Sequence, residues 1–375
     1  MVVNMKKVLH LRSSFDPGGT ETLLLNLFNF PQQYFRIYFV LLKDGTLISQ
    51  LDEQRSGNLY FKWFRSRFFD LSVLRKLSQL VKREQIELVH THQFIELVYA
   101  VGLKLLCFGK LRIVHQVHLL FEEKDLAFYL ERTLSRLFAR VVTVSKAAKD
   151  TLVADYGFDR QRVGVLYNAV TNGVQPGLDL DAARAQLGVP LDSKRINVCM
   201  VANFVWGKDH ETIFAAYDQY IRGQLPDVSL YLIGKESQLS RRLVDQYLLE
   251  EDVHNGRVVL CGAIPNASAL LPLFDMAVMS CFSETFNIAL VEAACAGKVI
   301  LASDIPVFRE LSGNGKYFRL FEAGNPKDFF DNLQAMISQL DSLETQTAAN
   351  HFRRAFSYPA FVKALDEIYT AEASY

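Results

Sequence analysis

The chain has 375 residues, of which 50% are hydrophobic and 22% are charged, and its formal net charge is zero. This length exceeds what one compact core usually needs, so we expect two soluble domains. The balanced charge argues against a protein that coats nucleic acid. None of the five cysteines lies in a CxxC pair, which disfavours a zinc site or a disulfide framework and favours a reducing compartment.

Two features concern the cellular location. No uncharged apolar run of about 18 residues and no signal-like start is present, so we expect a cytoplasmic protein. Residues 1–170 contain 24 Lys and Arg against 16 Asp and Glu, a net of +8, and residues 171–375 carry the opposite excess. The basic half predicts an anionic partner such as a membrane surface, although solvated surface charge accounts for it equally well.

Short β-branched and aromatic runs alternate with amphipathic segments along the whole chain, which is typical of α/β proteins with parallel sheets. The expected strands of the first half are 6–14, 35–43, 58–64, 87–92, 112–118 and 140–145. The expected helices between them include 21–30, 71–85 and 125–138. In chain order, the Gly- and Pro-containing segment 171–181 (TNGVQPGLDLD) then predicts a linker.

The alternation restarts after this linker. The expected strands of the second half are 196–204, 228–234, 258–264, 276–282, 298–303 and 316–321. The sequence therefore predicts two Rossmann-like parallel sheets in series. Ligands of such open sheets bind at the carboxyl ends of the strands, so we expect the site residues at these ends.

The end of the first strand is followed by a glycine pair and a helix. Gly18 and Gly19 could let a phosphate or a sugar approach the backbone, and the helix that follows offers free N–H groups. An ordinary tight turn explains the pair as well, and Glu21 is equally suited to the first turn of a helix. The spacing is not the GxGxxG fingerprint, which disfavours a nicotinamide cofactor.

Histidines end two further strands of the first half. His92 closes the strand 87–92 and His118 closes the strand 112–118, so both are expected at the same edge of the sheet. His90 and His92 have no acidic or cysteine partner at a recognised metal spacing, and we expect no metal. His92 and His118 are therefore expected to form hydrogen bonds, either with other parts of the protein or with a polar ligand. Their position at the same edge of the sheet favours a ligand.

In the second half, Lys208 stands just before an expected helix, in the segment 201–217. There its ammonium group and the helix N-terminus could share one anion. A solvated loop lysine is the simpler interpretation of this residue taken alone.

Residues 283–293 (SETFNIALVEA) contain two glutamates, Glu284 and Glu292, after the apolar strand 276–282. Asn287 is suited to cap the following helix and Gly297 to end it. Glu284 then lies in the loop at the carboxyl end of the strand, and Glu292 lies between one and two turns into the helix.

This placement suggests how a nucleotide could bind. If the amides near Ile288 and Ala289 hold a diphosphate, Glu292 can reach the ribose hydroxyls and Glu284 faces the group beyond the phosphate. Two glutamates at this spacing also occur by chance, so the strand–loop–helix setting carries the interpretation.

The segment 60–70 (YFKWFRSRFFD) interleaves six aromatic residues with Lys62, Arg65 and Arg67. Aromatic rings beside cations suit contact with anionic lipid headgroups, and Trp63 is typical of such an interface. A partly buried strand followed by a basic loop is the alternative. Nucleic-acid binding could use the same residues but is disfavoured by the neutral charge of the chain.

The order of these motifs resembles the retaining family-4 glycosyltransferases (glycosyl transferases group 1), which have the two-domain GT-B fold. The resemblance spans almost the whole chain and rests on GGTE (18–21), LVHTH (88–92), VHQVH (114–118), VTVSKAAKDTL (142–152), VLYNAV (165–170), VANFVWGKDH (201–210) and SETFNIALVEAACAGKVILAS (283–303).

The resemblance implies an α/β fold with two Rossmann-like parallel-sheet domains that face a central cleft. The acceptor-side domain would span 1–172 and the nucleotide-sugar domain 173–358. The terminal helix, 359–375, would pack back on the first domain, as the segment FSYPAFVKALDEIY suggests.

The implied activity is retaining transfer of a hexosyl or N-acetylhexosaminyl group from a UDP-sugar to a lipid-linked or polysaccharide acceptor, as in lipopolysaccharide and other cell-surface glycans. The leaving diphosphate itself would help to deprotonate the acceptor, so the protein supplies mainly positive charge and positioning. Neither a cofactor nor a metal is implied. The expected partners are the nucleotide-sugar donor, the glycan or lipid-linked acceptor and an anionic membrane surface on the cytoplasmic side, without nucleic acid.

The resemblance also implies roles for single residues. His118, Lys208 and Glu284 would act in catalysis. Donor binding would involve Gly18, Gly19, Asn203, Lys208, Glu284, Phe286, Asn287, Ile288, Ala289 and Glu292. Apart from the resemblance, the composition of segment 60–70 places Lys62, Trp63, Arg65 and Arg67 on the acceptor and membrane side, and His92 is expected there as well.

Two positions depart from the family pattern. Asn203 stands where an arginine often shares the diphosphate with the lysine, and Asn287 stands where a glycine is common. These departures leave the donor sugar open. A sugar-nucleotide epimerase of the same fold and a non-catalytic glycan-binding protein are the alternatives.

Overall fold

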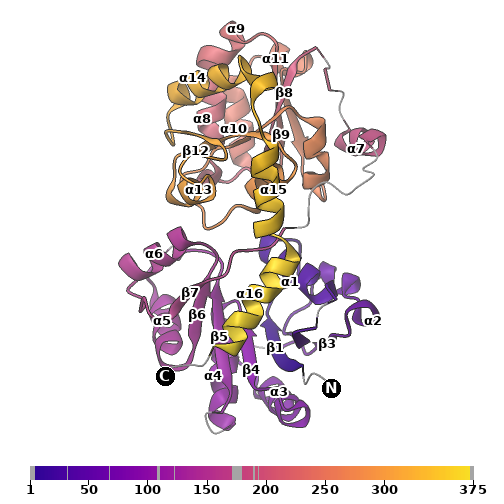
Figure 1. Ribbon diagram of the computed structural model, residues 1–375, viewed down its shortest axis with the longest axis vertical. Coiled ribbons are helices and arrows are strands. Elements are labelled where there is room, and N and C mark those ends of the chain that lie inside the picture. Colours follow the sequence, from indigo (N-terminus) through magenta and orange to yellow (C-terminus); the bar gives the residue numbers. More distant parts are fainter. Residues whose placement is uncertain are drawn as a thin grey trace. The chain divides into compact units, whose positions relative to one another are not determined.

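The computed structural model describes residues 5–31, 33–66, 68–107, 110–121, 123–170, 180–188, 191–192 and 194–371. The chain forms two compact units, one of Met1–Ala169 with Tyr358–Tyr375 and one of Val170–Ser357 (Figure 1). Most of the predicted linker, residues 171–179, lies outside the described residues. Each unit is built around one parallel sheet, which confirms the predicted fold class.

The first unit contains a seven-stranded sheet in the order β3-β2-β1-β4-β5-β6-β7, with every pair parallel. Its strands are β1 (Lys6–Arg12), β2 (Phe35–Leu41), β3 (Leu59–Lys62), β4 (Leu88–Thr91), β5 (Arg112–Val117), β6 (Arg140–Thr143) and β7 (Val163–Val165). The register places His10 of β1 beside His90 of β4. The carboxyl ends of β1, β4 and β5 therefore lie next to one another.

Helices cover both faces of this sheet. They are α1 (Gly19–Asn29), α2 (Glu53–Ser56), α3 (Leu71–Glu84), α4 (Phe94–Leu106), α5 (Leu126–Phe138), α6 (Lys146–Ala154) and α16 (Tyr358–Thr370), with a 3₁₀ turn η1 (Thr46–Gln50). One core joins α1 and α16 to the sheet, and α16, drawn in yellow, lies beside α1 (Figure 1). A second core joins α3 and α4 to the opposite face.

The second unit contains a six-stranded parallel sheet in the order β10-β9-β8-β11-β12-β13. Its strands are β8 (Ile196–Val201), β9 (Val228–Ile233), β10 (Val258–Gly262), β11 (Met276–Met279), β12 (Val299–Ser303) and β13 (Arg319–Phe321). The order reverses between β8 and β11, which is the point where such sheets bind ligands.

The helices of this unit are α7 (Leu180–Leu187), α8 (His210–Ala216), α9 (Arg222–Gln224), α10 (Gln238–Tyr247), α11 (Glu250–His254), α12 (Ile288–Cys295), α13 (Pro306–Leu311), α14 (Pro326–Ile337) and α15 (Gln346–Ala355). A π-helical turn, η3 (Tyr217–Ile221), joins α8 to α9, and 3₁₀ turns occur at η2 (Trp206–Lys208), η4 (Ala267–Leu273) and η5 (Leu340–Ser342). The main core packs α8 and α14 against the strands.

The strand predicted over 276–282 ends earlier, at Met279. The next residues bond to side chains instead of to a neighbouring strand, because the Ser280 hydroxyl donates to Asp209 at 2.8 Å and the Cys281 amide donates to the Ser303 hydroxyl at 2.9 Å. The loop that carries Glu284 therefore begins earlier in the sequence than predicted, directly after Met279.

All five cysteines are free thiols. No helix in the described part of the chain is both long and apolar enough to cross a membrane.

Candidate functional site

The glycine pair after β1 packs closely on the helix that it opens. Gly18 is extended, and a Cβ at this position would lie 2.5 Å from a carboxylate oxygen of Glu21. Gly19 is already the first residue of α1. A side chain at position 18 would therefore displace the Glu21 carboxylate, which forms an ion pair with Arg12 at the end of β1.

Arg12 belongs to a buried network that the sequence did not reveal. Its guanidinium also contacts Glu96, at 3.3 Å, in the first turn of α4. Glu96 is fully buried and accepts hydrogen bonds from the Ser13 amide at 2.8 Å and the His92 amide at 2.7 Å. Because a buried carboxylate needs such partners, the network fixes the carboxyl ends of β1 and β4 relative to each other. The capping-box spacing from Gln93 to Glu96 was the available signal.

His92 and His118 meet at the predicted sheet edge. His92 Nδ1 lies 3.1 Å from His118 Nε2. Burial lowers the pKa of His118 to about 3, with the Arg12 charge as a second cause, and burial likewise holds the pKa of His92 well below its usual value. Both rings are therefore neutral at physiological pH and act as hydrogen-bonding groups.

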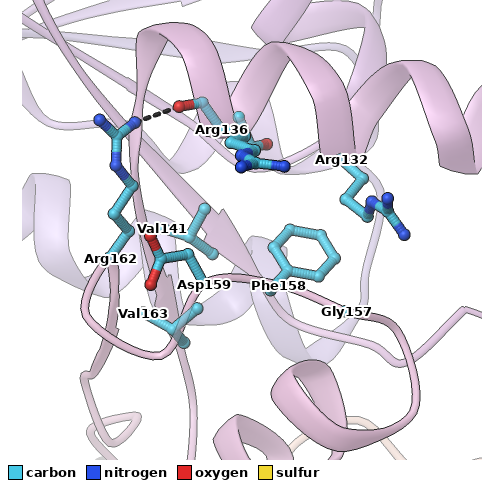
Figure 2. A pocket seen from close by; sticks show the side chains of 9 residues that line it. Arg132, Arg136, Val141, Gly157, Phe158, Asp159, Arg162 and Val163 are labelled. Atoms are coloured by element: carbon cyan, nitrogen blue, oxygen red, sulfur yellow. Dashed lines mark hydrogen bonds between the residues drawn. The ribbon is translucent and has the colours of Figure 1, made fainter.

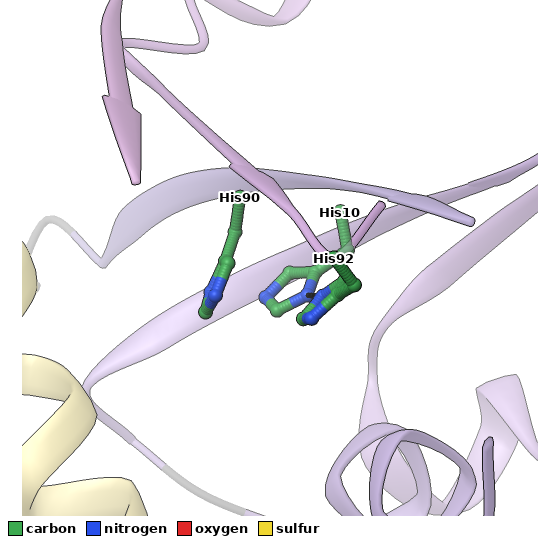
Figure 3. Close-up of side chains that lie close together, drawn as sticks. All are labelled: His10, His90 and His92. Carbon is green, nitrogen blue, oxygen red and sulfur yellow. Dashed lines mark hydrogen bonds between the residues drawn. The ribbon is translucent and has the colours of Figure 1, made fainter. Parts of the chain in front are cut away.

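Three buried histidines, His10, His90 and His92, form the cluster of possible metal ligands found among the described residues (Figure 3). Their ring nitrogens come within 4.8 Å of one another. The His92 ring is inclined by 22° to His10 and by 23° to His90, and the His10 and His90 rings are tilted by 39° to each other. His10 Nδ1 lies 3.3 Å from His92 Nε2 and His90 Nδ1 lies 2.6 Å from the Tyr369 hydroxyl, so these nitrogens serve as hydrogen-bonding partners in this structure.

In the second unit, Lys208 and Glu284 form an ion pair although they are 76 residues apart. Lys208 closes the η2 turn before α8, and Glu284 lies in the loop after β11. Burial alone would lower the pKa of Lys208, but the Glu284 carboxylate outweighs it and raises the pKa. The ammonium group is therefore charged. The tertiary structure brings together two residues that the sequence assigned separately.

Asn287 caps α12 as predicted. Its side-chain oxygen accepts a hydrogen bond from the Leu290 amide at 2.9 Å, and its backbone is left-handed, with φ 63°. This conformation favours glycine or asparagine and explains why the departure from glycine is tolerated. Phe286, directly before it, is buried, whereas Ile288 and Ala289, which open the helix, are half-buried.

Glu292 lies in the second turn of α12 and is half-buried. Burial raises its pKa to about 7, against a hydrogen bond from Ser268 that acts in the opposite direction. No cation pairs with it among the ion pairs of the described residues. A carboxylate that is costly to ionise in the free chain is suited to a ligand that donates hydroxyl hydrogen bonds.

Three further residues lie in the loop that carries Lys208 and beside it. Asn203 is exposed, and its side-chain oxygen accepts from the Lys235 amide at 2.8 Å. The Trp206 ring is 73% exposed and stacks on Phe282, with centroids 5.2 Å apart. This exposed aromatic pair could not be predicted from the sequence, because its two residues are far apart in the chain.

The aromatic segment 60–70 is mixed in its exposure. Phe61 and Trp63 pack against the core of the first unit, whereas Lys62 is exposed and Arg65 is half-buried. Arg67 lies outside the described residues. The segment therefore presents less aromatic surface than its composition suggests.

One small cavity of the first unit is lined by three arginines, Arg132, Arg136 and Arg162 (Figure 2). Its volume of about 10 Å³ holds about one water molecule, so it cannot take a nucleotide.

Comparison with known families matches both halves of the chain. Residues 17–172 match the family described as Glycosyltransferase Family 4, and residues 195–339 match the family described as Glycosyl transferases group 1. The chain belongs to the family-4, group-1 glycosyltransferases. This confirms the predicted family, and the two matched regions correspond closely to the two structural units.

Curated relatives of this glycosyltransferase include two bacterial enzymes. A D-inositol 3-phosphate glycosyltransferase of Paenarthrobacter aurescens is 24% identical over 74% of this chain and 70% of the relative. The UDP-Gal:alpha-D-GlcNAc-diphosphoundecaprenol alpha-1,3-galactosyltransferase of Escherichia coli is 23% identical over 80% of this chain and 79% of the relative.

Solved structures share the fold of this glycosyltransferase over nearly its whole length. Anabaena HepE in complex with UDP matches with a TM-score of 0.80 and 19% identity, covering 97% of this chain and 99% of that one. The lipopolysaccharide outer core galactosyltransferase WaaB matches with a TM-score of 0.69 and 17% identity, covering 98% and 99%. These similarities confirm the GT-B fold.

Proposed function

We propose that this glycosyltransferase moves a hexosyl or N-acetylhexosaminyl group from a UDP-sugar to a lipid-linked or polysaccharide acceptor, with retention of the anomeric configuration, in cell-surface glycan synthesis. The observation that carries the proposal is the meeting of Lys208 and Glu284 beside the capped start of α12. The structures of HepE with UDP and with UDP-glucose, and the galactosyltransferase of Escherichia coli, support a UDP-sugar donor.

In this proposal the second unit binds the donor. The diphosphate lies against Lys208 and the free amides of Ile288 and Ala289, and the ribose hydroxyls donate to Glu292. Because Asn203 carries no charge, Lys208 and the helix amides provide the positive charge at the diphosphate without the usual arginine. Glu284 exchanges its ion pair with Lys208 for hydroxyl groups of the donor sugar.

The chemistry then needs stabilisation of the leaving group more than a protein base. Lys208 and the amides of α12 stabilise the negative charge that develops on the diphosphate, and that diphosphate accepts the acceptor proton. The first unit positions the sugar and the acceptor through Gly18, Gly19 and His118, and the buried His92 holds the His118 ring. We propose no metal and no cofactor in this step.

We further propose that the first unit docks on an anionic membrane surface, and that α5 rather than segment 60–70 is the main contact. Leu126, Tyr129, Leu130 and Leu137 are all exposed, with Leu126 at 75% and Leu137 at 62%. Their spacing places them along one side of the helix, so α5 turns an apolar face to solvent. Leu119, which directly follows His118, is exposed as well.

Basic side chains adjoin this apolar face. Arg132 and Arg136 belong to α5, and Arg162 bonds to the backbone carbonyl of Arg136 (Figure 2). An exposed apolar helix face beside guanidinium groups is suited to insert into the headgroup region of an anionic bilayer. The segment 60–70 contributes its exposed Phe64 and Phe68 as a second contact.

A donor screen tests the proposed function. The purified chain is incubated with UDP-glucose, UDP-galactose, UDP-N-acetylglucosamine and the corresponding ADP- and GDP-sugars, and thermal stability is measured. A UDP-sugar that binds the folded chain raises its melting temperature by mass action. Absence of any shift with every nucleotide sugar contradicts the proposal.

Release of free UDP separates the alternatives. A transferase releases UDP with the correct acceptor, such as a diphosphoundecaprenol-linked sugar, and releases little without it. An epimerase instead interconverts UDP-sugars without an acceptor, and a non-catalytic binding protein shows the thermal shift without either product.

A further inference from the structure

A continuous chain of hydrogen bonds runs through the first unit from α16 to the end of β5. Tyr369 Oη lies 2.6 Å from His90 Nδ1 and 3.1 Å from His10 Nε2. His10 Nδ1 lies 3.3 Å from His92 Nε2, and His92 Nδ1 lies 3.1 Å from His118 Nε2. Both nitrogens of His10 and both of His92 are thus engaged within the chain.

The sheet explains why these rings meet. His10 and His90 are paired in register on neighbouring strands β1 and β4, and His92 follows His90 by two residues, on the same face. Figure 3 shows the His10, His90 and His92 side chains close together. α16 packs on that face and brings Tyr369 to it from 251 residues beyond His118 in the sequence.

Every member of the chain is neutral. Burial lowers the pKa of His10 and of His118 to about 3 and lowers those of His90 and His92 well below the usual value. Burial also raises the pKa of Tyr369 well above its usual value, so its hydroxyl keeps its proton. A neutral imidazole has one N–H and one lone pair, and each link of the chain therefore holds a single proton.

The distances at Tyr369 set the direction of these protons. The shorter distance, 2.6 Å, fits the hydroxyl proton donated to His90 Nδ1, and 3.1 Å fits an N–H donated by His10 Nε2. His10 then accepts at Nδ1 from the N–H of His92, and His92 accepts at Nδ1 from His118 Nε2. One choice at Tyr369 determines the tautomer of every ring.

We propose that Tyr369, His10 and His92 are positioning residues that hold His118 as the tautomer with its proton on Nε2 and its lone pair on Nδ1. Nδ1 of His118 then accepts hydrogen bonds and does not donate them. The catalytic consequence rests on the proposed function: Nδ1 accepts a hydrogen bond from a hydroxyl of the donor sugar or the acceptor.

Nitrogen NMR of the full chain labelled with ¹⁵N-histidine tests the tautomer directly, since protonated and lone-pair nitrogens have well-separated shifts. The His118 signals are assigned by their loss in His118→Gln. In the parent we expect a proton on Nε2 of His118. In Tyr369→Phe, which removes one hydroxyl and keeps the ring, we expect both His118 shifts to move towards the average of the two tautomers.

Tyr358→Phe is the matched control. Tyr358 lies on the same helix, is buried, and donates its hydroxyl to the Leu23 carbonyl, outside the chain of histidines. This variant is expected to leave the His118 signals unchanged. A proton on Nδ1 of His118 in the parent, or unchanged His118 signals in Tyr369→Phe, overturns the proposal, and neither result depends on any enzymatic activity.

Kinetics give a second readout. If the competent tautomer falls to about half of the population, Tyr369→Phe lowers kcat about twofold with the donor KM unchanged. An equal rate in both variants overturns the catalytic consequence. Zn²⁺ that binds the parent stoichiometrically and fails to bind His10→Phe also overturns the proposal, because the ring nitrogens would then be metal ligands.

Discussion

The ammonium group of Lys208 and the carboxylate of Glu284 are ion-paired, with side chains only 28% and 13% exposed. The pair joins the loop before α8 to the loop after β11, on the two strands where the sheet order reverses. Before a donor binds, the Lys208 charge is thus already compensated. In the proposed donor complex, a diphosphate replaces Glu284 as the partner of Lys208 and releases the carboxylate for another contact.

This exchange predicts a separation of binding from transfer in Glu284→Gln. Without the competing carboxylate, Lys208 is available to the diphosphate, so UDP binds as tightly as in the parent or tighter. Transfer falls by on the order of 100-fold, because the contact with the donor sugar is lost. Calorimetric titration with UDP and acceptor-dependent UDP release measure the two effects.

Glu211→Gln is the control for this substitution. Glu211 lies in the same unit and pairs with Arg242 at 3.1 Å, with both side chains largely exposed. It should change neither UDP affinity nor transfer. Parent-like turnover in Glu284→Gln would contradict the site assignment.

Glu292 makes stability depend on pH in a direction opposite to most carboxylates. Its pKa is about 7 in the folded chain and 4.5 as the ordinary value, so between these pH values the folded state holds a proton that the unfolded state has lost. The free energy of unfolding therefore falls as pH rises from 4.5 to 7, by up to about 3 kcal/mol at about 1.4 kcal/mol per pKa unit.

Glu292→Gln is accordingly expected to unfold at a higher urea concentration than the parent at pH 8 and at nearly the same concentration at pH 4.5. The same variant should bind UDP more weakly, since only a carboxylate accepts two hydroxyl hydrogen bonds. In the parent, UDP affinity should rise from pH 6 to pH 8 as Glu292 ionises, and in Glu292→Gln this rise should disappear. A variant that is less stable than the parent at pH 8 would refute the burial argument.

The left-handed backbone at Asn287 predicts a difference between glycine and alanine at this position. Asn287→Gly loses the cap to Leu290 but keeps the conformation, at a cost of a few tenths of a kcal/mol. Asn287→Ala loses the cap and places a Cβ at φ 63°, at a cost of about 2 kcal/mol. Urea unfolding of both variants measures the difference, and equal stability would argue against strain at this turn.

The exposed face of α5 predicts lipid binding by the first unit. The parent should sediment with vesicles that contain phosphatidylglycerol and much less with phosphatidylcholine vesicles. Leu130→Ser with Leu137→Ser should weaken the binding by about tenfold for each leucine, as expected when a leucine no longer leaves water. The binding should also weaken as salt is raised, because the arginines beside α5 contribute.

The matched control replaces exposed apolar residues elsewhere. Leu249→Ser with Val253→Ser changes two residues of the second unit that are 49% and 45% exposed. This variant should bind vesicles like the parent. Equal loss in both double variants would indicate nonspecific apolar binding instead of a defined surface.

Local patterns were sufficient to predict most strands and the main helices. The apolar runs of the strands are buried on both faces, and α12 begins after Asn287 as its capping residue requires. The end of β11 was predicted three residues late. The apolar pattern continues through Ser280 and Cys281, but in the structure these residues form hydrogen bonds with the side chains of Asp209 and Ser303.

The candidate site was predictable in its parts and not in its contacts. Strand-end position and helix capping indicated His118, Lys208, Glu284 and Glu292. The sequence did not predict three features of the structure: the ion pair between Lys208 and Glu284, the buried network of Arg12, and the exposed apolar face of α5. A residue's partner depends on which strands become neighbours, which periodicity does not encode.

The sequence by itself determined two parallel-sheet units, the order of their strands along the chain and the family to which they belong, because hydrophobic period and local turn chemistry act over a few residues. Only the tertiary structure decided that Tyr369 reaches His10 and His90, and that Glu292 is buried enough to resist ionisation. Those properties arise from burial and from contacts between residues distant in the chain, which exist only once the sheets and helices have packed.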